Sequence, residues 1–123
     1  MDFYRHQTRP DVMVLVADHG LDAYEGAPLI DDLMRSMDAG TQTLVIDCSR
    51  LGHVGTIAVC ALVTLHRRLA MAGKELRLAA VQAPLWHVLT ITRLDQVFHL
   101  FPSVEEAERA PAQPAATLSH QPH

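Results

Sequence analysis

Aromatic side chains are scarce in this 123-residue sequence and basic residues do not outnumber acidic ones, and both features argue against several classes of protein. Aromatic residues make up 5% of the chain, too few for the stacking platforms that bind single-stranded RNA. The formal net charge is −4, whereas a general nucleic-acid binder needs a basic face to neutralise phosphates. No apolar run approaches the roughly 20 residues that span a bilayer. We therefore expect neither nucleic acid nor a membrane as a partner.

Cysteine is also rare. Cys48 and Cys60 are too few for a disulfide framework, and we interpret both as small buried hydrophobic residues of a reducing compartment. The first seven residues contain no apolar signal-peptide region. These features predict a cytoplasmic protein.

The composition is otherwise that of an ordered globular domain, with 49% hydrophobic and 20% charged residues. The length suits one domain with a proper core. Beyond residue 110 the composition shifts to Pro, Ala, Gln, Ser and His. We therefore predict a domain over 1–110 and a flexible C-terminal tail over 111–123.

Strand-like and helix-like patterns alternate along the domain, which predicts an α/β fold with a central mixed β-sheet of about four to five strands and about four helices. Helices are predicted from Pro28, Thr56, Pro84 and Ser103, the last with Glu106 three residues on as a capping box. Strands are predicted over 12–17, 43–47, 75–81 and 97–101, with a short edge strand before residue 10.

The chain is organised around residues 44–62. A buried strand ends at Asp47, a polar turn follows, and Thr56 is predicted to cap a helix that runs to about Met71 and ends at Gly73. This order puts one hydroxyl at a helix N-terminus beside the carboxyl end of a strand, where open α/β sheets usually place their working residues. The predicted apolar row of the helix includes Ile57 and Ala61 and continues through Leu65 and Leu69.

Three motifs occur in a familiar order. His19-Gly20-Leu21-Asp22 is similar to a Gly-x-Leu-Asp turn, and Leu44-Val45-Ile46-Asp47-Cys48-Ser49 is similar to an apolar run that ends in Asp-Leu-Ser. The third comprises Gly73-Lys74-Glu75-Leu76, then Leu94-Asp95, then Phe101-Pro102-Ser103-Val104-Glu105-Glu106-Ala107. Together they resemble the STAS domain, the family of sulphate-transporter cytoplasmic domains and bacterial anti-sigma factor antagonists, over about residues 12 to 109.

The resemblance also points to a site. The antagonists carry an Asp-Ser-Ser/Thr-Gly motif eight residues after the strand aspartate, which here begins at Gly55 and places Thr56 at the position of the serine that the partner kinase phosphorylates. Gly55, Ile57 and Ala58 depart from that motif. The hydroxyl of Thr56 therefore has two interpretations, a helix N-cap and a phosphorylation switch.

The resemblance implies that an anti-sigma factor, a serine kinase-like protein, docks around this helix end. The predicted contact residues are Asp22, His53, Val54, Gly55, Thr56, Ile57 and Val59. Asp22 is equally well interpreted as a turn carboxylate, His53 as an exposed loop histidine, and Asp47 as a structural residue that supports the following loop.

The sequence contains no residue pattern typical of a metal site or of nucleophilic catalysis. Eight histidines are scattered without metal-ligand spacing, and neither Ser49 nor Cys60 has a patterned base or Gly-rich elbow. We therefore expect no catalytic residues, no metal and no cofactor, and we predict a protein that is not an enzyme.

The predicted function is that of an anti-sigma factor antagonist, which binds the anti-sigma factor and releases a sigma factor. One alternative is a STAS domain without the phosphorylation switch, which binds constitutively or acts as a scaffold. Another is a sensor of a small ligand or nucleotide that uses a pocket at the strand ends. The sequence does not indicate an oligomeric state.

Overall fold

The computed structural model describes residues 2–5, 11–17, 26–37, 40–52 and 55–110. The strands are β1 (Asp2–Arg5), β2 (Val12–Val16), β3 (Thr43–Asp47), β4 (Glu75–Ala79) and β5 (His99–Phe101). The helices are α2 (Gly26–Ser36), α3 (Thr56–Met71), α4 (Ala83–Ile91), α5 (Val104–Arg109) and the short 3₁₀ helix η1 (Leu94–Gln96). The predicted alternation of strands and helices is confirmed.

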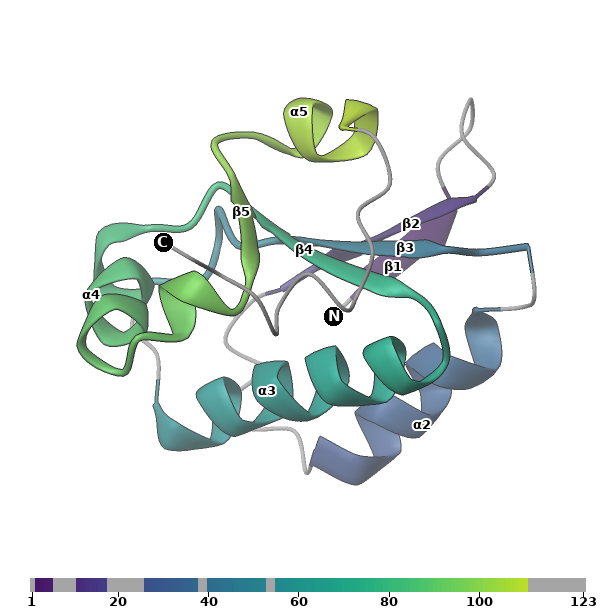
Figure 1. Cartoon of the computed structure of the whole chain (residues 1–123), viewed down its shortest axis with the longest axis horizontal. Helices are drawn as coiled ribbons and strands as arrows, with labels where there is room; N and C mark the ends of the chain where they lie inside the picture. The colour runs from purple at the N-terminus through teal and green to yellow at the C-terminus, as the bar shows by residue number, and fades with distance from the viewer. Residues whose placement is uncertain (1, 6–10, 18–25, 38–39, 53–54, 111–123) are drawn as a thin grey trace.

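The five strands form one sheet in the order β1-β2-β3-β4-β5 (Figure 1). β1 pairs with β2 in antiparallel fashion, and β2 through β5 are parallel to one another. Parallel strands place their carboxyl ends at one edge of the sheet, so Val16, Asp47, Ala79 and Phe101 end there together. The sheet is therefore mixed, as predicted.

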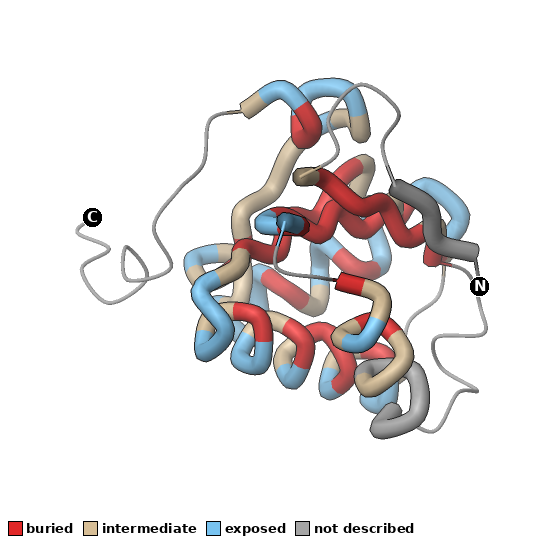
Figure 2. The backbone as a smooth tube through the Cα atoms, turned by 90° about the vertical axis from the view of Figure 1, so that its right-hand side faces the viewer, coloured by how far each residue is buried: buried red, intermediate tan, exposed pale blue. Residues whose placement is uncertain are grey.

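Alternate residues of each strand face opposite sides of the sheet, and they pack into two separate hydrophobic cores. Met13 and Leu15 of β2 belong to the larger cluster, whereas Val12 and Val14 belong to the smaller one. The larger cluster also contains side chains of α2, α3 and α4. Figure 2 shows buried backbone concentrated in the strands and on the inward sides of the helices.

α3 buries one side against the sheet and leaves the other in solvent. Its buried residues are Ala58, Ala61, Leu62, Leu65 and Leu69. The prediction that Ile57 joins this apolar row is wrong, because its side chain is 55% exposed. Cys60 is also exposed rather than buried, whereas Cys48 is buried as predicted. At 100° per residue, both errors arise because 57 and 60 fall on the side of the helix turned away from Ala58 and Leu62.

The predicted element ends are mostly within two residues of the observed ones, and two of the differences have a clear local cause. β4 ends at Ala79, not at residue 81, because Ala80 adopts a left-handed conformation with φ of 55°. β5 begins at His99, not at residue 97, because the η1 turn continues into the preceding residues and Phe98 N donates to Leu94 O over 3.0 Å.

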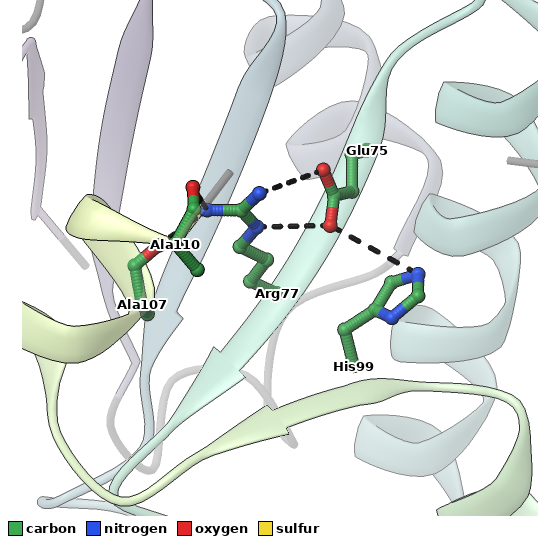
Figure 3. Close-up of polar contacts among 5 residues, drawn as sticks. All are labelled: Glu75, Arg77, His99, Ala107 and Ala110. Atoms are coloured by element: carbon green, nitrogen blue, oxygen red, sulfur yellow. Dashed lines mark hydrogen bonds and ion pairs between the residues drawn. The ribbon is translucent and has the colours of Figure 1, made fainter. Parts of the chain in front are cut away.

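On the smaller-core side of the sheet, α5 is held by a buried ion pair (Figure 3). The Arg77 guanidinium donates through Nε and Nη2 to both carboxylate oxygens of Glu75, at 2.9 and 3.0 Å. Its Nη1 donates to the carbonyls of Ala107 and Ala110, at 2.6 and 2.9 Å. His99 Nε2 lies 3.9 Å from the Glu75 carboxylate. One side chain of β4 therefore satisfies backbone carbonyls at the end of α5.

Candidate functional site

The turn that follows β3 is braced by Asp47. Its Oδ1 accepts a hydrogen bond from Ser49 N over 3.0 Å, and its carbonyl accepts from Ala17 N over 3.0 Å. A side-chain oxygen bonded two residues on is an Asx turn, which redirects the chain out of the strand. The interpretation of Asp47 as a structural residue is therefore confirmed.

Cys48 anchors the same turn inside the protein. Its amide donates to Ala79 O of the neighbouring strand over 2.8 Å, and its carbonyl accepts from Leu51 N over 3.0 Å. Burial, with Asp47 adjacent, raises the pKa of the Cys48 thiol to about 12. This thiol stays protonated at neutral pH, so it is a packed residue and not a nucleophile.

The first turn of α3 is the centre of the candidate site. Gly55 is the N-cap, with an extended backbone and no side-chain cap, and its carbonyl accepts from Val59 N over 3.3 Å. The prediction that Thr56 is the N-cap is wrong: Thr56 is the first residue of the helix. The N-cap is the last non-helical residue, whose side chain can accept from the N–H groups two or three residues on, and Gly55 holds that position. The Thr56 side chain is exposed.

The residues beside Thr56 form an accessible patch with an apolar component. Ile57 and Cys60 are exposed and Val59 is half-buried, whereas Ala58 is fully buried. An exposed isoleucine next to an accessible hydroxyl offers a partner both apolar contact area and a group that can be modified. Of the predicted contact residues, Gly55, Thr56, Ile57 and Val59 lie at this helix end, with Ile57 and Val59 on roughly opposite sides of its axis. Their role as contacts stays a prediction.

Three predicted contact residues lie outside the described residues. These are Asp22, His53 and Val54. Their roles therefore stay predictions.

The sequence interpretation missed exposed apolar side chains on α4. Trp86 is 46% exposed and Ile91 is 67% exposed. The buried residues of α4 are Leu85 and Leu89. With Leu85 and Leu89 inward, helical periodicity turns Trp86 away from the core, so the sequence could have predicted its exposure.

The structure also contains a groove of about 760 Å³ between α3 and the η1 region. It is lined by Val63, His66, Arg67, Ala70, Met71, Leu94 and Val97. The sequence did not predict it, because its two sides come from segments more than 20 residues apart. This groove is mostly apolar, which does not suit the polyphosphate of a nucleotide. A nucleotide pocket at the strand ends stays a prediction.

Two negative findings concern the described part of the chain. Within it, no three His, Cys, Asp or Glu side chains are grouped so that they could hold a metal ion. None of the described helices combines the length and the apolar character that a bilayer crossing needs.

Comparison with known proteins identifies the family. The family model of the STAS domain matches residues 4–107, most of the chain. The chain therefore belongs to the STAS domain family, which confirms the resemblance seen in its motifs.

Solved structures share the fold at low sequence identity. The NMR structure of the protein TM1081 superposes with a TM-score of 0.71 at 16% identity and covers 85% of this chain and 88% of its own. A crystal structure of that Thermotoga maritima protein, proposed there to be an anti-sigma factor antagonist, gives 0.64 at 15% identity over 86% and 89%. A sulfate transporter family protein from Wolinella succinogenes gives 0.68 at 14% identity over 89% and 88%. At these identities the comparison establishes the fold.

Proposed function

We propose that this STAS domain is an anti-sigma factor antagonist that binds a serine kinase-like anti-sigma factor and thereby releases a sigma factor. The observation that carries the proposal is the exposure of Thr56 and Ile57 in the first turn of α3. Thr56 is the residue that the sequence resemblance aligns with the family's phosphorylated serine. The family and the structural likeness to a proposed antagonist support it.

The partner would dock over the start of α3. Ile57 supplies an exposed aliphatic side chain that a partner pocket can bury, and burial of a side chain of this size is worth roughly 1.5–3 kcal/mol. Val59, three residues after Thr56, adds half-buried apolar surface on the side of the helix away from Ile57. The predicted contacts of Asp22, His53 and Val54 would extend this footprint onto the adjacent loops.

Phosphorylation of Thr56 would switch the interface off. A phosphate adds up to about two negative charges, which a docked apolar surface would have to desolvate. α3 carries no acidic residue in its first turn, so the positive end of the helix dipole tolerates the anion. The modification would therefore change binding and leave the fold intact.

The phosphorylation step is tested by incubating the protein with its cognate kinase and ATP and measuring intact mass. We expect the mass of one phosphate in the wild type and in Thr64→Ala, and no gain in Thr56→Ala. Thr64 is the matched control, because it is an exposed threonine on the same helix. A gain that survives Thr56→Ala contradicts the switch.

A second candidate is a STAS domain that binds its partner without a phosphorylation switch. The departures at Gly55, Ile57 and Ala58 favour it, and the exposed Ile57 provides a contact that needs no modification. Partner affinity measured by calorimetry separates the two. Loss of binding in Thr56→Asp supports the switch, whereas loss in Ile57→Asp with unchanged affinity in Thr56→Asp supports constitutive binding.

A further inference from the structure

The groove between α3 and the η1 region has mostly apolar walls, and Arg67 is the one arginine or lysine among the described residues that line it. Val63, Ala70 and Met71 come from α3, and Leu94 and Val97 come from the η1 region. Met71 is 82% exposed, an unusual position for a flexible apolar side chain without a covering partner. The volume of the groove, about 760 Å³, lies within the range of small-molecule sites.

The polar groups of the groove favour an anion. Arg67 is exposed, and no carboxylate among the described residues pairs with it, whereas the adjacent Arg68 pairs with Asp31 of α2 at 3.2 Å. His66 packs edge-on against Phe98, with ring centroids 5.5 Å apart. Burial, together with the nearby His99 and Arg67, holds the pKa of His66 below its usual value of 6.5. The imidazole is therefore neutral at pH 7, and Arg67 provides the positive charge.

The length of the groove limits the size of its occupant. From Val63 to Met71 the helix rises by roughly 12 Å at 1.5 Å per residue. An extended chain advances by roughly 1.1–1.2 Å per bond, because the three backbone bonds of a residue span about 3.3–3.6 Å. An unbranched chain of about ten carbons is therefore as long as the stretch of α3 that lines the groove.

We propose that this groove binds a medium-chain aliphatic carboxylate, with the chain along Val63, Ala70 and Val97 and the carboxylate on the Arg67 guanidinium. Apolar walls remove the chain from water, and a guanidinium accommodates a carboxylate through two parallel hydrogen bonds. The site is independent of Thr56 phosphorylation, because its residues begin two turns further along α3.

Titration of the full-length protein with decanoate, below its micelle concentration, tests the site. With methionine methyl groups labelled by ¹³C, we expect the Met71 signal to shift in a saturable way and the signals of the buried Met13 and Met37 to stay in place. Decanol should bind more weakly, because it lacks the charge. Acetate should not bind, because it lacks the chain. An unmoved Met71 signal overturns the proposal.

Two arginine variants test the charge. Arg67→Gln should weaken decanoate binding by about tenfold or more, the loss expected for a charge-assisted hydrogen bond, and should leave decanol binding unchanged. Arg68→Gln is the matched control and should bind decanoate like the wild type, since Arg68 does not line the groove. Equal weakening in both variants, or decylammonium binding as tightly as decanoate, overturns the proposal.

Discussion

At the scale of single residues, the shift of one position at the start of α3 changes what Thr56 can do. A threonine that served as N-cap would hold its oxygen on a backbone N–H, and a kinase would have to break that bond. Gly55 occupies the cap instead, and the Thr56 side chain is exposed at the first helical position. The hydroxyl is therefore available for modification at a site where an added anion is electrostatically tolerated.

The two cysteines should differ sharply in reactivity. Cys60 is exposed on α3, whereas Cys48 is buried with a pKa raised to about 12. The thiolate is the reactive form, so a thiol reagent at pH 8 should modify Cys60 in the native protein and reach Cys48 after unfolding. Intact mass before and after addition of denaturant measures this.

Cys60→Ser is the control for this prediction. It should show no rapid modification in the native state and one modified thiol in denaturant. Rapid modification of native Cys60→Ser would mean that Cys48 is accessible, contrary to the structure.

At the scale of elements, Arg77 joins β4 to α5. Its side chain is 1% exposed, yet its donors reach the Glu75 carboxylate and two carbonyls at the end of α5. The guanidinium also lies over the Phe101 ring, 5.4 Å from its centroid. A helix of six residues is too short to be stable alone, so these contacts and the buried Ala107 hold it on the sheet.

Removal of either member of this ion pair should destabilise the protein strongly. Arg77→Met removes the guanidinium from the buried Glu75 carboxylate, and Glu75→Leu removes that carboxylate from the buried Arg77 guanidinium. Each change should cost about 3–5 kcal/mol in the free energy of unfolding, measured by urea denaturation.

The double variant Glu75→Leu/Arg77→Met shows whether breaking the ion pair causes the loss of stability in the single variants. It should lose less than the sum of the single changes, because neither buried charge remains, although the carbonyls of Ala107 and Ala110 still lose their donor. Arg109→Ala, an exposed arginine on α5, should stay within ~0.5 kcal/mol of the wild type. Additive losses in the double variant would contradict a coupled pair.

Elements whose ends are marked by nearby residues in the sequence were predicted more accurately than elements whose ends depend on packing. β3 and α3 were predicted well because their ends are marked in the sequence by an apolar run, a polar turn and a glycine, Gly73. In the structure Gly73 has a φ of 75°, which favours glycine. The start of β5 was misplaced because apolar residues at 97 and 98 resemble a strand, whereas packing turns them into the end of η1.

At the scale of the whole molecule, the site and the groove differ in what sequence could reveal. Thr56 was predicted because the resemblance places the family motif eight residues after Asp47, within one strand-turn-helix unit. The exposure of Ile57 was not, since an apolar residue in an amphipathic helix is usually assigned to the core. The groove needed the fold itself, because Leu94 and Val97 reach α3 only after β4 and α4 have been placed.

The two faces of the sheet also differ in how much of the chain supports them. Side chains of α2, α3 and α4 pack into the larger core, whereas α5 supplies Ala107 and Val104 to the smaller one. The end of the domain therefore depends on α5, the last described helix. The family match ends at residue 107, within this helix.

We propose that the folding unit ends just beyond Ala110 and that residues 114–123 add nothing to its stability. A chain that ends at residue 113 keeps both carbonyl acceptors of Arg77 and should unfold at the same urea concentration as the full chain. A chain that ends at residue 103 loses α5, uncovers Val12, Val14 and Val45, and leaves Arg77 without those acceptors. Its free energy of unfolding should fall by several kcal/mol. A lower midpoint for the 113-residue chain would show that the tail packs on the domain.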